Sequence, residues 1–506
     1  MLQINHLTIT HIKDLRTVVT DLSLVLSPGD KAAVIGEEGN GKSTLLKLIY
    51  DPALVEGYTE WTGSIVKKGI RLGYLPQELP PDWQHTPAWE FWDGGAPLNP
   101  AQGARLLEAL NVPQETANSF QPMKSLSGGE RIKLQLARIL AQEPDVLLLD
   151  EPSNDLDLEA LQWLEEFLIS SPLAVLFVSH DETLLEKTAN MVVHLEALRR
   201  KAAPRCTVSH VPYRDYVEAR QAKFQHQAQV SRKEHDEFRK QMDRFLRIRN
   251  KVDHQQATIS RQDPHGGRLL KKKMHAIESM GRRFEKEKEK LTQMPEMEEA
   301  IFLRFSEAIR IPRGKTVLEL HLPILETGGR ELARNIHLKV QGPEKVGIVG
   351  PNGCGKTTLL RLLSKELLAR SDLRCAYMPQ NYEECLDLNR TPVDCLNRSG
   401  SRAEATKIRS YLGSLRFTTL EMDHPARELS GGQKAKLFFL QMILEEADVL
   451  LLDEPTRNFS PLSGPVIREI LKDFGGTILS VSHDRRYLEQ VCDTIFALTP
   501  DGLVKL

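Results

Sequence analysis

Short apolar runs, each followed by glycines or acidic residues, lie in both halves of this chain. Lys31–Ile35, Leu147–Leu149 and Leu450–Leu452 are such runs. A short continuous apolar run bounded by turn signals is typical of a buried strand. The first run leads through a glycine-rich loop into Thr44–Ile49, which has the pattern of a helix. The two halves are therefore predicted to be α/β.

In the middle of the chain the apolar positions repeat with a different spacing. Apolar or small residues recur at steps of four and three over Phe224–Phe245 and again over Leu270–Phe284. This spacing predicts two helices with seams along which they can lie against each other as an antiparallel hairpin. The pattern is broken by Pro and Gly at Asp263–Gly267, where we place the turn. The first helix should cover about Tyr213–Val252, roughly 60 Å at 1.5 Å per residue.

Charge is distributed unevenly along the chain. Basic residues outnumber acidic ones over Tyr213–Thr292, although the whole chain has a net charge of −2. Clustered Lys and Arg are the footprint of contact with a phosphate backbone. A solvated spacer whose lysines only keep it soluble is the other interpretation. The excess is greatest over 244–273, the predicted hairpin tip, whose candidate RNA-binding residues are Arg244, Arg247, Arg249, Lys251, Arg261, Arg268, Lys271, Lys272 and Lys273.

The bulk composition indicates a soluble protein of two or three domains. A length of 506 residues is enough for several cores. No apolar run approaches the ~20 residues needed to span a bilayer, and Met1–Ile9 lacks the layout of a signal peptide. The six cysteines form no CxxC pair, so we interpret them as free thiols in a reducing cytosol. A cytoplasmic location is expected.

The loop after the first apolar run has the sequence of a phosphate-binding loop. Gly36–Ser43 fits GxxxxGK[ST] between a predicted strand and a predicted helix. Glycines let backbone N–H groups turn toward phosphate oxygens, and the helix N-terminus adds a positive dipole. Lys42 adds a point charge, and the Ser43 hydroxyl can face Mg²⁺.

Further motifs complete the first half of the chain. Asp150 and Glu151 end an apolar strand, where Asp150 suits a ligand of Mg²⁺ and Glu151 suits polarising a water for attack on a terminal phosphate. Ser127-Gly128-Gly129 opens a second helix that can offer N–H groups to an anion. Gln77 and His180 are the remaining candidates.

All five motifs recur in the second half of the chain. The glutamine, the glycine helix, the carboxylate strand and the histidine follow one another at separations of 50, 23 and 30 residues in both copies. Such spacing indicates a duplicated domain. We expect a first copy over 1–198, a connector over 199–300 and a second copy over 301–506. The candidates of the second copy are Gly350, Asn352, Gly353, Cys354, Gly355, Lys356, Thr357, Thr358, Gln380, Ser430, Gly431, Gly432, Asp453, Glu454 and His483.

The sequences LSGGE and LSGGQ, each between a phosphate loop and LLLDEP, resemble the signature of ATP-binding-cassette proteins. Two cassettes joined by a basic helical hairpin, with Tyr213-Arg214-Asp215-Tyr216 at its start, resemble the ABC-F class. The resemblance implies two P-loop NTPase cassettes of the ABC type in tandem, joined by an antiparallel α-helical hairpin. It also implies a monomer in which the two cassettes pair within one chain.

Members of that class bind the ribosome near its tRNA exit site. The resemblance therefore implies an ATP hydrolase that uses ATP and Mg²⁺ to clamp and release, as a translation factor or an antibiotic-resistance ribosomal protection protein. The connector would contact large-subunit rRNA and an exit-site or peptidyl tRNA. An ATPase subunit of a transporter with separate membrane subunits, and a DNA-associated ATPase, are the alternatives. The basic connector is the feature that argues against the first of these.

The resemblance also implies two composite sites. In each, one cassette supplies the catalytic glutamate, glutamine and histidine, the phosphate loop, and a hydroxyl and an aspartate for Mg²⁺, while the other supplies its signature. The first site would combine Gly36, Gly39, Asn40, Gly41, Lys42, Ser43, Thr44, Gln77, Asp150, Glu151 and His180 with Ser430, Gly431 and Gly432. The second would combine Gly350, Asn352, Gly353, Cys354, Gly355, Lys356, Thr357, Thr358, Gln380, Asp453, Glu454 and His483 with Ser127, Gly128 and Gly129.

Two departures from the family pattern distinguish this chain. Ser460 stands where the first cassette has Asp157, which predicts that the two sites are unequal. The stretches His11–Arg16 and Leu325–Arg330 contain no Phe, Tyr or Trp, although the family usually places an aromatic ring on adenine there. Discrimination between ATP and GTP is therefore left open.

Overall fold

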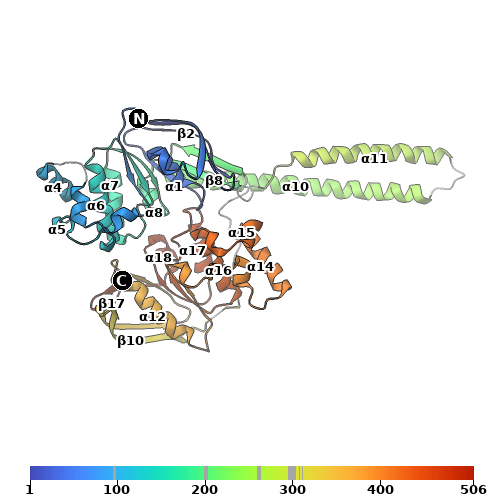
Figure 1. Cartoon of the computed structure of the whole chain (residues 1–506). Helices are drawn as coiled ribbons and strands as arrows, with labels where there is room; N and C mark the ends of the chain where they lie inside the picture. Colours follow the sequence, from blue (N-terminus) through green and yellow to red (C-terminus); the bar gives the residue numbers. More distant parts are fainter. Residues whose placement is uncertain (95–98, 199–202, 259–263, 295–303, 307, 310) are drawn as a thin grey trace. The chain divides into compact units, whose positions relative to one another are not determined.

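The computed structural model describes residues 1–94, 99–198, 203–258, 264–294, 304–306, 308–309 and 311–506. The chain divides into two compact units, one formed by Met1–Tyr213 with Glu298–Leu506 and the other by Arg214–Met297. The first unit contains two α/β cassettes and the second is a helical hairpin (Figure 1). The predicted fold class is confirmed.

The first cassette is built on a six-stranded sheet in the order β5-β6-β7-β3-β8-β9. Its first five strands are parallel, and β9 is antiparallel to β8. A separate antiparallel sheet has the order β2-β1-β4. The strands are β1 (Leu2–His11), β2 (Thr17–Leu26), β3 (Lys31–Ile35), β4 (Thr59–Val66), β5 (Leu72–Leu75), β6 (Val146–Asp150), β7 (Ala174–Val178), β8 (Met191–Ala197) and β9 (Ala203–Ser209).

The predicted apolar runs are buried strands, since every residue of β3 and β6 is buried. The apolar face of α1 packs with these strands in one core, and a second core lies among the helices around Phe91, Met123 and Leu134. The helices are α1 (Lys42–Tyr50), α2 (Pro81–Gln84), α3 (Ala88–Asp93), α4 (Pro100–Ala109), α5 (Gln114–Ala117), α6 (Gly128–Leu140), α7 (Leu158–Ser170) and α8 (Glu182–Thr188), with 3₁₀ turns at Pro52–Leu54 and Met123–Ser125.

The second cassette repeats this plan with the sheet order β13-β14-β15-β12-β16-β17 and a two-stranded sheet β10-β11. Among the described residues its antiparallel sheet has no counterpart of β4, because only 369–374 connect α12 to β13. The strands are β10 (Thr316–Thr327), β11 (Arg330–Gln341), β12 (Lys345–Val349), β13 (Cys375–Met378), β14 (Val449–Asp453), β15 (Thr477–Val481), β16 (Thr494–Thr499) and β17 (Gly502–Lys505). The helices are α12 (Lys356–Leu368), α13 (Pro392–Leu396), α14 (Arg402–Ser414), α15 (Thr419–Asp423), α16 (Gly431–Leu444), α17 (Gly464–Lys472) and α18 (Arg485–Val491), with 3₁₀ turns at Tyr382–Glu384 and Ala426–Glu428.

The hairpin consists of α10 (Tyr213–Thr258) and α11 (Pro264–Lys290), which lie side by side in Figure 1. The first helix is longer than predicted. The predicted break at Asp263–Gly267 is wrong in part, because the backbone over 264–267 is the first turn of α11. Proline is well tolerated at the first position of a helix, where its missing N–H would have no partner in the helix. Asp263 lies outside the described residues.

An apolar seam joins the two helices of the hairpin. The rings of Phe245 and Phe284 meet edge to face at a centroid distance of 5.3 Å. Near the other end of the seam, the hydroxyl of Ser231 donates to the carbonyl of Thr292 at 2.8 Å. His235, which the spacing over Phe224–Phe245 also places on the seam, is exposed. The packed seam leaves the outer faces of both helices to solvent.

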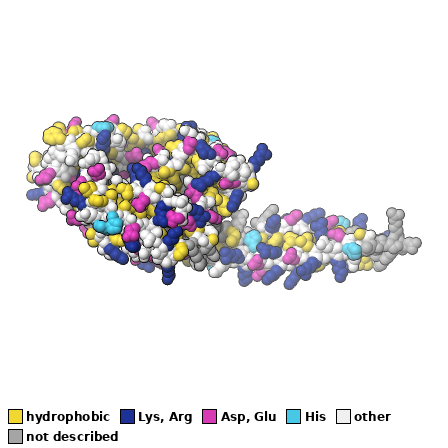
Figure 2. Space-filling model, turned by 90° about the horizontal axis from the view of Figure 1, so that it is seen from below, with side chains coloured by type: hydrophobic (Ala, Val, Ile, Leu, Met, Phe, Trp, Pro, Cys, Tyr) yellow, Lys and Arg dark blue, Asp and Glu magenta, His cyan; other side chains and the backbone are white. Residues whose placement is uncertain are grey.

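Basic side chains occupy those outer faces. Figure 2 shows Lys and Arg side chains along the hairpin. Arg261 lies outside the described residues. The other eight candidate RNA-binding side chains are exposed, namely Arg244, Arg247, Arg249, Lys251, Arg268, Lys271, Lys272 and Lys273. These side chains are therefore accessible to an anionic partner. No helix in the described ranges is long and apolar enough to cross a membrane.

Ion pairs join the two cassettes away from the phosphate loops. Arg468 of α17 donates to both carboxylate oxygens of Glu182 of α8, at 2.7 and 3.0 Å, and both side chains are buried. Arg486 also donates to Glu182, at 3.2 Å. In a second pair, Arg485 contacts the buried Glu165. Bidentate charge-assisted contacts fix orientation as well as contributing energy.

We expect replacement of Arg468 by methionine to destabilise the protein by about 1–3 kcal/mol, because the buried Glu182 loses its bidentate donor while Arg486 remains. The midpoint of urea unfolding, followed by tryptophan fluorescence, measures this. The matched control is Arg409→Met, because the Arg409–Asp423 pair is 45% exposed on both sides and should be worth less than about 1 kcal/mol. Equal midpoints for the two variants would contradict the expectation.

Candidate functional sites between the cassettes

The two phosphate loops have the same local geometry. The Nζ of Lys42 donates to the carbonyls of Gly36 and Glu37 at 2.8 and 3.1 Å. The Nζ of Lys356 makes the matching bonds to Gly350 and Pro351 at 2.7 and 2.8 Å. Each lysine is thus folded back over its own loop, where it can be redirected to a phosphate. Gly39, Gly41, Gly353 and Gly355 all have positive φ, which curls the loops.

Not every candidate of the phosphate loops faces the site. The side chain of Asn40 is buried and donates to the carbonyl of Leu195 at 3.0 Å. It therefore anchors the first loop to β8. In the second loop, Asn352, Gly353, Thr357 and Thr358 line a cavity. Thr44 lies in the first turn of α1, and Cys354 is half-buried in its loop.

Each signature motif caps a helix. Ser127 is the N-cap of α6 and Ser430 is the N-cap of α16, and both form a capping box with the residue three positions later. The glycines lie in the first turn, so their N–H groups have no partner within the helix. A Cβ on Gly128 would come within 2.0 Å of the carbonyl oxygen of Asp155, so only glycine fits there.

The aspartates at the ends of β6 and β14 lie beside the hydroxyls predicted to share a metal ion with them. Ser43 Oγ donates to Asp150 at 2.9 Å. Both carboxylate oxygens of Asp453 are buried without a hydrogen-bond partner among the described residues. Burial raises the pKa of each aspartate to about 6. A buried carboxylate without donors is what a bound cation would satisfy, so the residues present fit Mg²⁺.

The two glutamates that follow have the left-handed backbone, with φ 51° at Glu151 and φ 53° at Glu454. Non-glycine residues persist there only when their surroundings hold them, often at functional sites. Glu151 accepts from Gln77 Nε2 at 3.1 Å and lies 3.3 Å from His180 Nε2. His483 Nε2 is 3.8 Å from Glu454. The predicted glutamate and histidine therefore lie together in both cassettes.

The electrostatic settings of the two glutamates differ. Burial alone would raise the pKa of Glu151, but the nearby His180 and Lys42 outweigh it and lower that pKa to about 2. Burial, with Asp453 alongside, raises the pKa of Glu454 to about 8. Burial and the charge of Lys356 lower the pKa of His483 to about 4. The predicted inequality of the two sites thus has a counterpart in these local environments.

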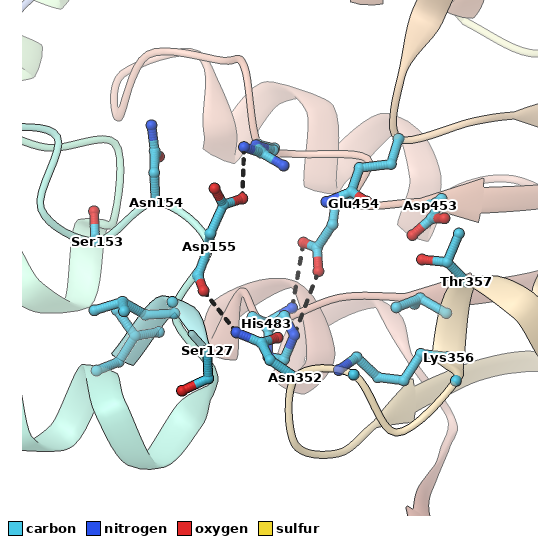
Figure 3. A pocket seen from close by; sticks show the side chains of 18 of the residues that line it. Ser127, Ser153, Asn154, Asp155, Asn352, Lys356, Thr357, Asp453, Glu454 and His483 are labelled. Carbon is cyan, nitrogen blue, oxygen red and sulfur yellow. Dashed lines mark hydrogen bonds and ion pairs between the residues drawn. The ribbon is translucent and has the colours of Figure 1, made fainter. Parts of the chain in front are cut away.

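The second site surrounds a cavity of about 760 Å³. Figure 3 shows Ser127 and Asp155 of the first cassette on one side and Lys356, Thr357 and Glu454 of the second on the other. The cavity is also lined by Gln380, Asp453, His483 and Gly128, so it unites most candidates of this site. Thr327, the last residue of β10, and Arg330, the first residue of β11, also line the cavity. The turn between these two strands has no aromatic residue.

Direct contacts across the second site involve the segment after β6. Asn352 Nδ2 donates to the carbonyl of Asp155 at 2.6 Å, and its backbone N–H donates to Asp157 at 3.3 Å. Arg457 pairs with the Asp155 carboxylate at 2.8 Å. The two cassettes thus meet head to tail at the second site.

The first site has different contacts at the corresponding positions. Glu38 of the first phosphate loop accepts a hydrogen bond from the backbone N–H of Gly432 in the opposite signature. Its neighbour Glu37 accepts from Ser460 Oγ at 2.6 Å and from Ser463, and pairs with Lys436 at 3.3 Å. Burial opposes ionisation of Glu37, yet Lys436 and the two hydroxyls lower its pKa to about 2.

Glu37 and Glu38 are site residues that the sequence motifs did not predict. They lie inside the phosphate loop at positions that the GxxxxGK[ST] pattern leaves free. Comparing the two loops could have found them, because Pro351 and Asn352 stand at the matching positions. At the first site the interface has Ser460 where the second site has Asp157, and the carboxylate there belongs to Glu37 of the opposite cassette.

Comparisons with known proteins agree with this architecture. The family described as "ABC transporter" matches residues 19–154 and 333–457. The chain is 32% identical to "Ribosome protection protein VmlR" of Bacillus subtilis (strain 168), over 98% of this chain and 86% of that protein. It is 26% identical to "ABC transporter F family member 2" of Arabidopsis thaliana, over 96% of this chain and 75% of that protein.

Among solved structures, the chain resembles the complex of archaeal ribosomal stalk protein aP1 and archaeal ribosome recycling factor aABCE1. The TM-score to the matched chain of that structure is 0.59 at 18% identity, and the match covers 99% of this chain and 90% of the matched chain. At this identity the likeness concerns the fold. Two matched cassettes and a relative aligned over nearly the whole chain lead to one assignment: the chain belongs to the ATP-binding-cassette family, in its F class, and is a nucleotide-binding, ATP-hydrolysing enzyme.

Proposed function

We propose that this chain associates with the ribosome, contacts RNA through the hairpin, and uses ATP and Mg²⁺ to clamp and release. The observation that carries the proposal is the joining of two cassette sites to a hairpin whose exposed outer faces are basic. Eight of its candidate side chains are exposed cations, as contact with a phosphate backbone requires.

In this proposal the glutamates Glu151 and Glu454 polarise the attacking water in their ionised form, so Glu454 must first lose the proton that its raised pKa retains. Gln77 and His180 hold Glu151 from two sides, which orients its carboxylate. Lys42 and Lys356 exchange their loop carbonyls for phosphate oxygens. A bound Mg²⁺ would supply positive charge against the charge that develops on the phosphate. It would be held by Ser43 with Asp150, and by Thr357 with Asp453.

The composite sites explain how nucleotide could drive closure. A phosphate loop alone lacks the N–H donors that the opposite signature helix supplies. Binding of a triphosphate would therefore draw the cassettes together, and loss of its terminal phosphate would weaken that contact. The residues proposed to act in trans are Ser127, Gly128, Gly129, Ser430, Gly431 and Gly432.

Association with the ribosome is supported by the relative named a ribosome protection protein, to which this chain is 32% identical. That name favours ribosome protection over a housekeeping role in translation. The hairpin would contact large-subunit rRNA and an exit-site or peptidyl tRNA. A transporter ATPase would have little use for such a hairpin, and a DNA-associated ATPase would bind duplex DNA through it.

Cosedimentation with ribosomes tests the proposal. The chain carrying Glu151→Gln and Glu454→Gln should pellet with ribosomes in ATP and stay in the supernatant in ADP, because only the triphosphate keeps the cassettes closed. Association should weaken steeply as salt rises, since cations on RNA displace counterions. Failure to pellet in ATP would contradict the proposal, and competition by duplex DNA as strong as that by free ribosomes would favour the DNA alternative.

A further inference from the structure

The two phosphate loops differ at the position that faces the opposite signature. The first loop is Gly36-Glu37-Glu38-Gly39 and the second is Gly350-Pro351-Asn352-Gly353. The third residue is therefore an acid in the first site and a neutral amide in the second. Both make contacts across the interface, but with different groups.

Glu38 lies on an anion-binding position. Its carboxylate accepts a hydrogen bond from the N–H of Gly432, in the first turn of α16. Its Oε2 is also 3.3 Å from the point where a Cβ on Gly431 would be. The free N–H groups and the dipole at a helix N-terminus attract anions, a terminal phosphate among them. In the second site the neutral amide of Asn352 contacts the carbonyl of Asp155 instead, so this position places no carboxylate on the signature N–H groups.

We propose that Glu38 competes with the terminal phosphate of a nucleoside triphosphate for the signature glycines of the first site. This inference rests on the proposed function, because it takes the signature of α16 as the phosphate-binding element. A triphosphate must displace the carboxylate, whereas a diphosphate leaves it in place. The first site is then biased toward diphosphate, and the second site, with Asn352, is the one that responds to triphosphate.

The surroundings of Glu38 favour this competition. Its neighbour Glu37 is tied to the second cassette by Ser460, Ser463 and Lys436. This anchor holds the loop against α16 and keeps Glu38 within reach of Gly432 at little cost in chain entropy. Glu38 itself is only half-buried and can swing aside. The carboxylate of Glu38 is thus close to the Gly432 N–H but not enclosed, so a phosphate can take its place there.

Nucleotide affinity at the first site tests the inference. In a full-length chain whose second site is weakened by Lys356→Ala, Glu38→Asn should strengthen binding of a non-hydrolysable ATP analogue by about tenfold, or about 1.4 kcal/mol. Binding of ADP should stay within about twofold, because the carboxylate and the diphosphate do not compete. Equilibrium dialysis with radiolabelled nucleotides and Mg²⁺ measures both affinities. Glu38→Gln keeps the shape and should show a smaller gain.

The second site provides the reciprocal test. In a chain whose first site is weakened by Lys42→Ala, Asn352→Glu should lower the affinity for the ATP analogue about tenfold and spare ADP. If the ratio of triphosphate to diphosphate affinity stays unchanged in Glu38→Asn, or both affinities move together, the inference is overturned while nucleotide binding stands. If the unmutated chain binds neither the ATP analogue nor ADP, the proposed function is overturned as well.

Discussion

Replacing Glu151 and Glu454 together by glutamine should slow ATP hydrolysis by about 10²-fold or more, the scale of losing a general base. Glutamine keeps the size of each side chain, so the hydrogen bond from Gln77 can persist and the cassettes can still close. ATP should therefore bind and remain bound. Release of inorganic phosphate, followed under single-turnover conditions, measures the rate.

A matched control for this variant is available on the surface. Glu143 and Glu446 occupy corresponding positions in the two cassettes and pair with exposed arginines. Their joint change to glutamine removes the same charge and should leave hydrolysis nearly unchanged. If the chain with Glu151→Gln and Glu454→Gln hydrolyses ATP at the rate of this control, neither glutamate acts as the proposed base.

Changing Lys271, Lys272 and Lys273 to glutamate should abolish the association of the ATP-trapped chain with ribosomes. All three side chains are exposed on α11, and each reversal removes a cation and adds a repelling charge beside RNA phosphates. Nucleotide binding by the isolated protein should be nearly untouched, because no cassette motif lies in the hairpin. Cosedimentation over a range of salt concentrations measures the loss.

The control for this change is the same charge reversal elsewhere in the helix. Lys286, Lys288 and Lys290 are exposed on α11 outside the basic region 244–273. Their change to glutamate alters the net charge equally but should weaken association much less. If the two triple variants pellet alike, the region 244–273 has no special role and the hairpin acts through its overall charge or as a spacer.

Much of the fold could be predicted because local pattern and topology agree. The run at Leu147–Leu149 is a strand buried on both faces, and such strands carry a continuous apolar pattern. The seam of the hairpin followed from its heptad spacing. The prediction wrongly left 264–267 out of the helix because proline was treated as a break, although at the first position of a helix it needs no N–H partner.

The composition of the sites could be predicted only as far as the repeated motifs reach. Lys356 and Glu454 lie where their motifs imply. The contacts of Glu37 and Glu38 could not be predicted, because they depend on which group of the opposite cassette comes within hydrogen-bond distance. The pairing of Arg468 with Glu182 is equally nonlocal, since 286 residues separate its partners. Periodicity carries no information about contacts of that kind.

The ion pairs between the cassettes have a consequence for assembly. Arg468 lies 303 residues after Glu165, and Arg485 lies 303 residues after Glu182, the same interval as from Asp150 to Asp453. The arginines of the second cassette thus stand at the positions of the glutamates of the first. Two first cassettes from separate chains would oppose glutamate to glutamate, and two second cassettes would oppose arginine to arginine. The opposite charges therefore favour pairing of a first cassette with a second cassette. Because both cassettes belong to one chain, each always has such a partner close by.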